Sequence, residues 1–170
     1  SGLKESLAGR FELIRMGHWS FKEMSDAFGL SLDEYIYFGG YPGAAGFLSD
    51  ESRWKRYIKD SIAAPAIEND ILQTSNIYKP ALMKRLFELG CKYSSEELSL
   101  TKVAGQLQDE GNVTTLASYL DLLDQCQLIS GLQKYANDDA RKYNSIPKFQ
   151  VYNNALLSAF QRKSYAAVRV

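Results

Sequence analysis

The sequence predicts a mainly α-helical fold, in which a helical lid is followed by a winged helix-turn-helix with a small β wing. Two observations carry this prediction. Apolar residues recur mostly at three- and four-residue spacing, as on the buried side of a helix. Two short strand-like stretches, 128–135 and 148–152, are separated by the polar segment "ANDDARKYNSIP", which has the length of a wing loop. Because a helix, a turn and a second helix precede these strands, the winged helix is expected at 77–152.

Short capped helices are predicted in the first part of the chain. Two capping boxes each pair a serine with a glutamate three residues later, and these pairs are Ser20 with Glu23 and Ser31 with Glu34. They predict helices that end at Phe28 and Tyr37. A helical turn at 2–9 and a strand at 11–16 come before them. The glycine-rich segment "FGGYPGAAG" at 38–46 is expected to break any regular element.

Two longer helices are predicted next, at 50–72 and 79–93. Along one side of the first lie four large apolar residues, Trp54, Tyr57, Ile58 and Ile62. Pro65 falls inside this helix and predicts a kink or a break. Pro80 stands in the first turn of the second helix, where its missing N–H does no harm. The wide apolar stripe of that helix predicts packing on more than one side.

The helix-turn-helix is predicted from two further helix starts. Ser99 or Thr101 caps a helix through Gln108, and Asn112 caps a helix to about Gln125. On a helical wheel the second helix has a core face of Val113, Leu116, Leu120 and Leu123. Its outward face holds Thr114, Thr115, Ser118, Asp121, Leu122 and Gln125. After the second wing strand, Asn153 or Asn154 starts a final helix, "NALLSAF".

Composition restricts the function classes. The chain has 170 residues, 45% of them hydrophobic, with twenty basic residues against twenty acidic ones. A net charge of zero argues against a dedicated nucleic-acid-binding domain. No apolar run reaches the ~18 residues of a membrane span, and no signal peptide is recognisable. Cys91 and Cys126 are predicted as buried free thiols of a reducing compartment, so we expect a cytoplasmic protein. The apolar ends of the chain suggest a fragment of a longer one.

No catalytic or metal-binding residues are predicted. His18 is the single histidine and is expected to be structural, and two cysteines with one histidine fit no zinc spacing. The carboxylate pairs Glu96–Glu97, Asp109–Glu110 and Asp138–Asp139 all lie in predicted turns. "GGYPGAAG" lacks the lysine and the serine or threonine of a phosphate loop. The chain is therefore expected to hold no cofactor and not to hydrolyse ATP alone.

The helix from Asn112 is a candidate nucleic-acid interface, together with basic residues beside it. The candidate contact residues are Lys102, Thr114, Ser118, Gln125, Arg141 and Lys142. Duplex affinity depends mainly on neutralising phosphates, yet this helix carries Asp121 and Asp124 and no lysine or arginine. We therefore expect weak, sequence-independent DNA binding at most. The alternative is contact with another domain or chain, with Leu122 as an apolar anchor.

Several stretches occur together in a known order: "SLAGRFELI", "HWSFKEM", "EYIYFGGYPGAA", "AIENDIL" and "PKFQVYNNALLSAF". In this the chain resembles the prokaryotic AAA+-type P-loop ATPases that carry a DUF4143 domain, over nearly its whole length. "LAGR" and "GGYPG" are the most specific motifs. The resemblance implies an upstream ATPase core, which binds ATP and Mg²⁺, and makes Arg10 a nucleotide-sensing arginine that acts only with that core. It also implies an acidic position at Asp70, without an assigned role.

The resemblance further implies three regions: the end of the ATPase core and the lid at 1–76, the winged helix at 77–152, and the start of a truncated C-terminal domain at 153–170. Many relatives have an aspartate at the position of Asn153, so metal-dependent nuclease chemistry is in doubt here. The sequence thus favours a non-catalytic lid and winged-helix portion that couples nucleotide state to a protein partner. The alternative is a nucleic-acid-binding module of a DNA-acting ATPase. Expected partners are the ATPase core and an unidentified protein or a further copy of the chain, with no membrane.

Overall fold

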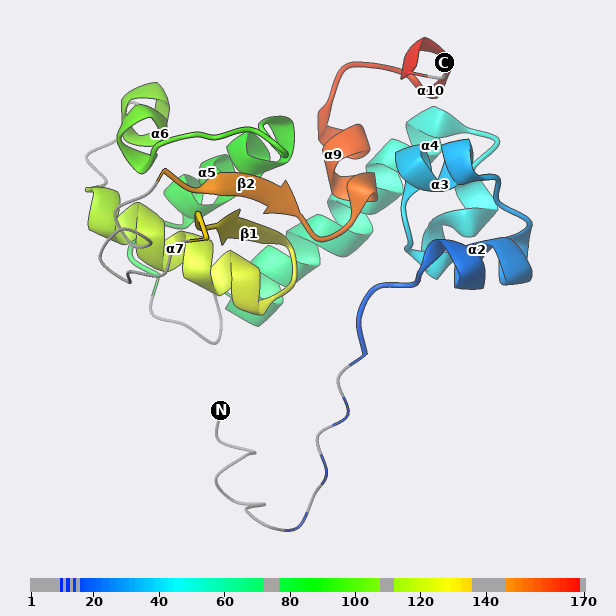
Figure 1. Cartoon of the computed structure of the whole chain (residues 1–170), viewed down its shortest axis with the longest axis horizontal. Helices are drawn as coiled ribbons and strands as arrows, with labels where there is room; N and C mark the ends of the chain where they lie inside the picture. Colours follow the sequence, from blue (N-terminus) through cyan, green and yellow to red (C-terminus); the bar gives the residue numbers. More distant parts are fainter. Residues whose placement is uncertain are drawn as a thin grey trace.

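The computed structural model describes residues 10, 12, 14, 16–71, 77–107, 112–135 and 146–168. This part of the chain is mainly helical and contains a small two-stranded antiparallel sheet (Figure 1). Its elements are α2 (Phe21–Phe28), α3 (Leu32–Phe38), the 3₁₀ helix η1 (Pro42–Phe47), α4 (Glu51–Arg56), η2 (Tyr57–Ala63), η3 (Ala66–Ile71), α5 (Pro80–Lys92), α6 (Leu100–Leu107), α7 (Val113–Gln125), β1 (Ile129–Leu132), β2 (Lys148–Val151), α9 (Asn154–Phe160) and α10 (Tyr165–Val168).

Both predicted capping boxes are present. The Glu23 carboxylate accepts a hydrogen bond from the Ser20 backbone N–H at 2.7 Å, and this bond lowers the pKa of Glu23. At the start of α3, the Glu34 carboxylate accepts from the Ser31 N–H at 2.9 Å, and the Glu34 N–H donates to the Ser31 hydroxyl at 3.3 Å. Gly29 ends α2 with a φ of 72°, a left-handed conformation that costs glycine little. These local signals placed α2 and α3 correctly because each acts within four residues.

Three predictions for the first part of the chain are wrong in whole or in part. Of the strand predicted at 11–16, the described residues 12, 14 and 16 lie in no strand, and no described strand pairs with them. The glycine-rich segment 38–46 ends α3 at Phe38 as expected, but most of the segment then forms η1 and is not irregular. A 3₁₀ turn needs only i→i+3 bonds, such as the 2.9 Å bond from the Ala44 N–H to the Tyr41 carbonyl.

The third error concerns Pro65, for which a kink or a break was predicted: the helix does not break there, and the kink stays a prediction. Helical structure runs without interruption from α4 through η2 and η3, and both later segments are π-helical. In η2 the N–H of Ala64 donates to the Lys59 carbonyl, five residues back. The wider π-helical turns on either side of Pro65 accommodate a residue that lacks an N–H.

Helix α5 is surrounded by several other elements. It packs on α6, α7, α9 and the sheet, so the expected packing on more than one side is confirmed. Its buried residues are Leu82, Met83, Leu86, Phe87, Gly90 and Cys91. Burial also raises the pKa of the Cys91 thiol well above its usual value. Cys91 is a buried free thiol as predicted, whereas the Cys126 side chain is only half-buried.

Helices α6 and α7 begin at the predicted caps. The Ser99 hydroxyl accepts from the Lys102 N–H at 3.2 Å, so Ser99 rather than Thr101 caps α6. At the start of α7, the Asn112 side-chain oxygen accepts from the Thr115 N–H at 2.8 Å. Helix α7 then packs against α5, α6, η3 and β1. These contacts on several sides determine which of its residues are buried.

Most of the predicted core face of α7 is confirmed, since Leu116, Leu120 and Leu123 are buried. Val113, predicted to be core, is 42% exposed, because no neighbour fully covers the first residue of the helix. Leu122, predicted to face outward, is half-buried and packs against the core. Tyr119 was missed and is buried, with its hydroxyl accepting a hydrogen bond from the Lys79 N–H at 3.1 Å.

The sheet joins β1 and β2 in antiparallel register, with Ile129 opposite Val151 and Leu132 opposite Lys148. Strand β1 is shorter than the predicted 128–135, since it ends at Leu132. The predicted connecting loop lies mostly outside the described residues. At Gly131 an added Cβ would lie 2.6 Å from the Leu120 side chain, so the glycine lets α7 approach the sheet closely.

Helix α9 lies between the sheet side of the molecule and the side formed by α3 and α4, and contacts both (Figure 1). It begins after Asn153, one of the two predicted caps. The short helix α10 was not predicted. Buried residues from Tyr37 to Ala159 form one hydrophobic cluster. The division into three regions stays a prediction. Within the described residues, no helix is long and apolar enough to cross a membrane.

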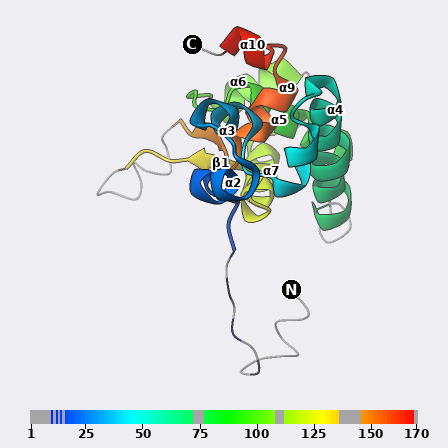
Figure 2. The same ribbon diagram turned by 90° about the vertical axis from the view of Figure 1, so that its right-hand side faces the viewer.

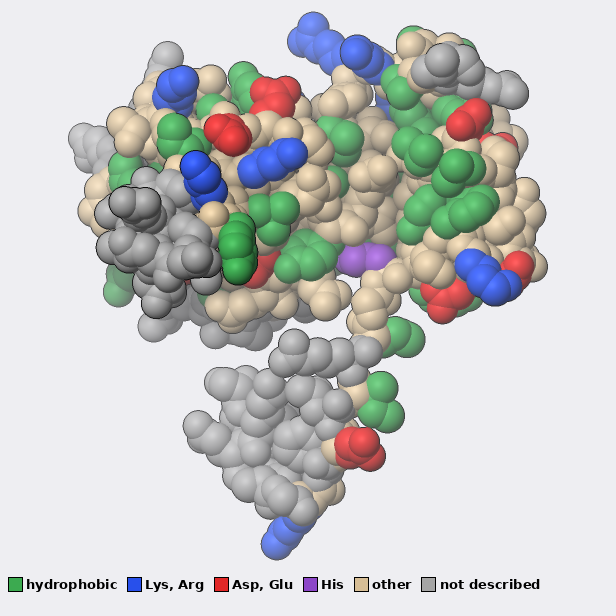
Figure 3. Space-filling view, in the orientation of Figure 1, with side chains coloured by type: hydrophobic (Ala, Val, Ile, Leu, Met, Phe, Trp, Pro, Cys, Tyr) green, Lys and Arg blue, Asp and Glu red, His purple; other side chains and the backbone are tan. Residues whose placement is uncertain are grey.

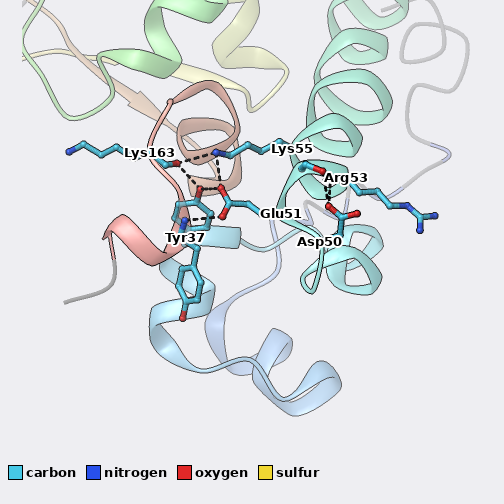
Figure 4. A network of polar contacts seen from close by, with 8 residues as sticks. Tyr37, Asp50, Glu51, Arg53, Lys55 and Lys163 are labelled. Atoms are coloured by element: carbon cyan, nitrogen blue, oxygen red, sulfur yellow. Dashed lines mark hydrogen bonds and ion pairs between the residues drawn. The ribbon is translucent and has the colours of Figure 1, made fainter.

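A polar network anchors the chain after α9 to α3 and α4 (Figure 4). Glu51 accepts from the Tyr37 hydroxyl at 2.8 Å and from the Tyr165 N–H at 3.0 Å, and pairs with Lys55 at 2.8 Å. Lys55 also donates to the Lys163 carbonyl at 3.0 Å. Burial, which has the larger effect, and the hydrogen bond to Glu51 both raise the pKa of Tyr37. The hydroxyl therefore stays a donor at neutral pH.

Candidate functional site around His18 and Asn153

Asn153 forms the centre of the most connected buried polar group in the described structure. Its side chain is only 4% exposed, and its Oδ1 accepts hydrogen bonds from the N–H groups of Gly40 and Ala155, both at 3.1 Å. Because Oδ1 faces two backbone donors, the amide orientation is fixed. The Nδ2 group then points at Nδ1 of His18, 3.3 Å away.

The two glycines of "FGGY" make this arrangement possible. Gly39 has a φ of 72°, and a Cβ there would overlap Oδ1 of Asn153 and come within 2.6 Å of the Ala155 N. A Cβ on Gly40 would overlap the Trp19 carbonyl oxygen. Sequence reasoning treated this segment only as a break in regular structure. The structure shows that the glycines permit close approach to α9 on one side and to the chain before α2 on the other.

His18 connects Asn153 to the end of α7. Since Nδ1 accepts from the Asn153 amide, the ring proton lies on Nε2, which donates to the Gln127 carbonyl at 3.1 Å. The imidazole and Tyr41 rings meet in a T-shaped contact, with ring centres 5.2 Å apart and planes at 89°. The histidine, purple in Figure 3, lies where the chain before α2 joins the body. His18 is half-buried, and all its described contacts are structural.

A small hollow of about 150 Å³ lies beside this group, lined by His18, Tyr35, Gly39, Tyr152, Asn153 and Asn154. At its edge the Tyr152 hydroxyl donates to Asp124 at 2.9 Å. Burial and then this bond raise the pKa of Tyr152, so the phenol stays protonated. Burial also raises the pKa of Tyr41. The side chains lining the hollow include no carboxylate and no thiol.

This arrangement joins four segments that are distant in sequence. His18 belongs to the segment before α2, Gly40 to the turn after α3, Gln127 to the turn between α7 and β1, and Asn153 to the start of α9. The described residues before His18, at 10, 12, 14 and 16, are exposed and lead away from the body in both views (Figure 2). A displacement of that segment would act directly on His18.

The predicted nucleic-acid contacts are only partly brought together. Thr114, Ser118 and Gln125 are exposed on one face of α7, which also carries the exposed Asp121. Thr114 and Ser118 line a hollow of about 340 Å³ beside Tyr78, whereas Gln125 lies at the far end of the helix.

The remaining predicted site residues are dispersed. Lys102 is exposed on α6, and Arg10 is exposed in the segment before α2. Arg141, Lys142 and the Asp70 side chain lie outside the described residues. In the described part of the chain, no group of three or more histidine, cysteine, aspartate or glutamate side chains is placed to hold a metal ion.

An apolar surface on α2 and α3 was missed by sequence reasoning. Its exposed side chains are Phe21, Phe28, Leu32 and Ile36, which are 37%, 46%, 54% and 49% exposed. Hydrophobic side chains gather over α3 in the space-filling view (Figure 3). Their spacings, seven residues within α2 and four within α3, indicate that the apolar side chains of each helix share one face. The spacings do not show whether that face is buried or exposed.

Comparison with known protein families gives one match. The family model of DUF8612, described as a domain of unknown function, matches residues 29–166. The chain belongs to the DUF8612 family. The DUF8612 match includes Gly39, Gly40 and Asn153 but begins after His18. No curated protein and no solved structure matches this chain.

Proposed function

We propose that this DUF8612 chain is the non-catalytic lid and winged-helix portion of an ATP-binding AAA+-like protein, and that it couples nucleotide state to a protein partner. The observation that carries the proposal is the double hydrogen bonding of His18, to Gln127 and to Asn153. One side chain on the segment before α2 thereby contacts both the end of α7 and the start of α9.

The sequence resemblance supplies the other half of the argument. It implies an ATPase core before α2 and assigns the nucleotide-sensing role to Arg10, eight residues before His18. A nucleotide-dependent movement at Arg10 would reach His18 along a short stretch of chain. The two hydrogen bonds of His18 would then transmit this movement to the end of α7 and the start of α9. No step of this transfer needs a reactive group in the chain itself.

The order of elements from α5 to β2 supports a winged helix within this proposal. Two capped helices, α6 and α7, pack against α5 and against each other, and a two-stranded antiparallel sheet follows. The face of α7 that would enter a DNA groove carries Asp121 and no lysine or arginine. This charge favours a protein partner. The apolar surface of α2 and α3 lies next to the segment before α2 and is suited to contact the ATPase core.

Hydrogen exchange in the full-length ATPase tests the coupling. Addition of a non-hydrolysable ATP analogue should change amide exchange both near Arg10 and in the segments 126–132 and 153–160. In a His18→Ala variant, the change near Arg10 should persist and the changes in the two distant segments should disappear, because both connecting bonds are lost.

Lys22→Ala is a suitable control, since Lys22 is exposed on α2 and, among the described residues, pairs with Asp26 alone. It should leave all the exchange changes in place. If the distant segments respond equally in His18→Ala and in the unmodified protein, His18 is not the coupling residue. If neither protein responds to nucleotide at all, the coupling function itself is wrong.

A second function, nucleic-acid binding, is favoured by one feature. Thr114 and Ser118 present hydroxyls beside Tyr78, which is 92% exposed and available to stack on a base. The acidic Asp121 on the same face of α7 argues against nucleic-acid binding. A measurement of salt-dependent binding to duplex DNA distinguishes this function from the coupling function.

A further inference from the structure

A third hollow, separate from the hollows beside His18 and Tyr78, is lined by residues of η2, η3, α5 and α9. Its volume is about 250 Å³, and its lining combines buried apolar residues with charged residues at the rim. None of the lining residues takes part in the His18–Asn153 contacts. What it binds is therefore a question separate from the coupling function.

The floor of this hollow is apolar. Ala63, Ile67 and Phe87 are each at most 3% exposed, and Phe160 meets Phe87 edge to face with ring centres 5.3 Å apart. Ala63 lines the same hollow, and its small side chain fills little of the space. An apolar cavity of about 150 Å³ holds a benzene ring. The hollow thus has room for one aromatic side chain with a short polar end.

The rim carries charges of both signs that the fold leaves available. The Lys59 ammonium lies 5.2 Å above the centre of the Phe160 ring and forms no ion pair with a described residue. Asp60 and Glu88 form no hydrogen bond or ion pair within the described structure. Lys84 is already neutralised by Glu68 at 2.6 Å. One ammonium and two carboxylates therefore remain for a ligand.

We propose that this hollow binds a free hydrophobic α-amino acid as its zwitterion. The apolar side chain would lie on Phe87 and Phe160, the ligand carboxylate would meet Lys59, and the ligand ammonium would meet Asp60 and Glu88. A purely anionic ligand would leave two carboxylates unmatched at the rim. A purely cationic one would leave the Lys59 ammonium without a partner. A zwitterion matches both signs.

Titration of the whole chain with L-phenylalanine, followed by NMR chemical shifts, tests the proposal. A ligand of this size is expected to bind with a dissociation constant of about 1 mM. L-phenylalaninamide lacks the negative charge and N-acetyl-L-phenylalanine lacks the positive one. Each should bind at least about fivefold more weakly, since a charge-assisted hydrogen bond is lost.

Charge variants of the rim assign each contact. Lys59→Met keeps the alkyl stem and should weaken phenylalanine binding about fivefold or more without weakening the binding of the cationic amide. Asp60→Asn with Glu88→Gln should weaken phenylalanine binding without weakening the binding of the anionic N-acetyl compound. Lys22→Met and Asp33→Asn serve as matched controls, because both residues are exposed and distant in sequence from the rim of the hollow. Unchanged melting temperatures show that the variants are folded.

Three results would overturn the proposal. Phenylalanine could show no binding even at a concentration 50 times the expected dissociation constant. The amide could bind as tightly as the free amino acid, which would indicate a peptide amino terminus instead. The rim variants could bind all three compounds like the unmodified chain. Each result is independent of whether His18 couples nucleotide to α7.

Discussion

The Asn153 side chain holds two backbone N–H groups that would otherwise be buried without an acceptor. Asn153→Ala removes the acceptor of Gly40 and Ala155 and the donor to His18. Each buried donor left unpaired costs about 1–3 kcal/mol. We predict a loss of about 2–4 kcal/mol in the free energy of unfolding, measured by urea denaturation.

Asn154→Ala is the matched control for this prediction. Asn154 is half-buried and donates one hydrogen bond, to the Ile36 carbonyl at 3.1 Å. It should cost about 1 kcal/mol or less. Asn153→Asp keeps the acceptor oxygen, so its loss in the free energy of unfolding should lie between those of Asn153→Ala and Asn154→Ala. Equal losses for Asn153→Ala and Asn154→Ala would show that the buried contacts of Asn153 contribute little.

Gly39 is the glycine whose replacement the structure tolerates least. Gly39→Ala would force a left-handed φ on alanine and place a Cβ against Asn153. Backbone strain and overpacking each cost about 1–2 kcal/mol, so we predict a loss of at least about 2 kcal/mol. Gly46→Ala, where a Cβ meets nothing within 4 Å, should be close to neutral. Thermal denaturation of both variants, compared with the unmodified chain, tests the difference.

At the scale of the element, α7 is positioned by its leucine face. Leu120 is 6% exposed and contacts the sheet beside Gly131, so Leu120→Ala should cost about 2–5 kcal/mol, as large-to-small core changes do. Val113, on the same helix, is 42% exposed, and Val113→Ala should cost under about 1 kcal/mol. Melting temperatures of the two variants provide the measurement. An unchanged melting temperature for Leu120→Ala would contradict the packing.

Helix α4 contributes an acid-sensitive anchor through Glu51. Burial by itself raises the pKa of Glu51, but hydrogen bonds from Lys55, the Tyr165 backbone and Tyr37 outweigh burial and lower it below its usual 4.5. A carboxyl whose folded pKa is lowered stabilises the protein above its unfolded pKa. The stabilisation disappears as pH falls through the folded pKa.

We therefore predict that the free energy of unfolding falls below about pH 4.5, and that Glu51→Gln makes this fall less steep. Urea denaturation at a series of pH values measures both slopes. Asp33→Asn, at an exposed position for which no ion pair is described, should keep the slope of the unmodified chain. Identical slopes for Glu51→Gln and the unmodified chain would mean that other carboxylates determine the acid limit.

At the scale of the whole molecule, the charge distribution predicts weak and sequence-independent DNA binding. The formal net charge is zero, and the outward face of α7 is acidic. We expect a dissociation constant of about 100 μM at physiological salt, measured by fluorescence anisotropy. Asp121→Lys with Gln125→Lys, both at exposed positions, should raise the affinity without sequence preference. Nanomolar, sequence-selective binding by the unmodified chain would favour the nucleic-acid function instead.

Local signals in the sequence determined where most helices begin. Ser20, Ser31, Ser99 and Asn112 cap their helices as predicted, because a cap depends on residues three positions apart. The spacing of Leu116, Leu120 and Leu123 likewise determined the buried side of α7. Residues at the ends of elements were less predictable, as Val113 shows, since a helical wheel does not contain the neighbours that cover a helix end.

The candidate site could not be obtained from the sequence. His18, Gly40, Gln127 and Asn153 are separated by up to 135 positions, and only packing of α9 between the two sides of the molecule brings them together. The same packing creates the hollow beside Phe87 and Phe160. The sequence by itself determined where most of the longer helices begin and which side of α7 is mainly buried, because those features depend on short-range signals. The tertiary structure decided which polar groups meet, because long-range contacts depend on how those faces pack.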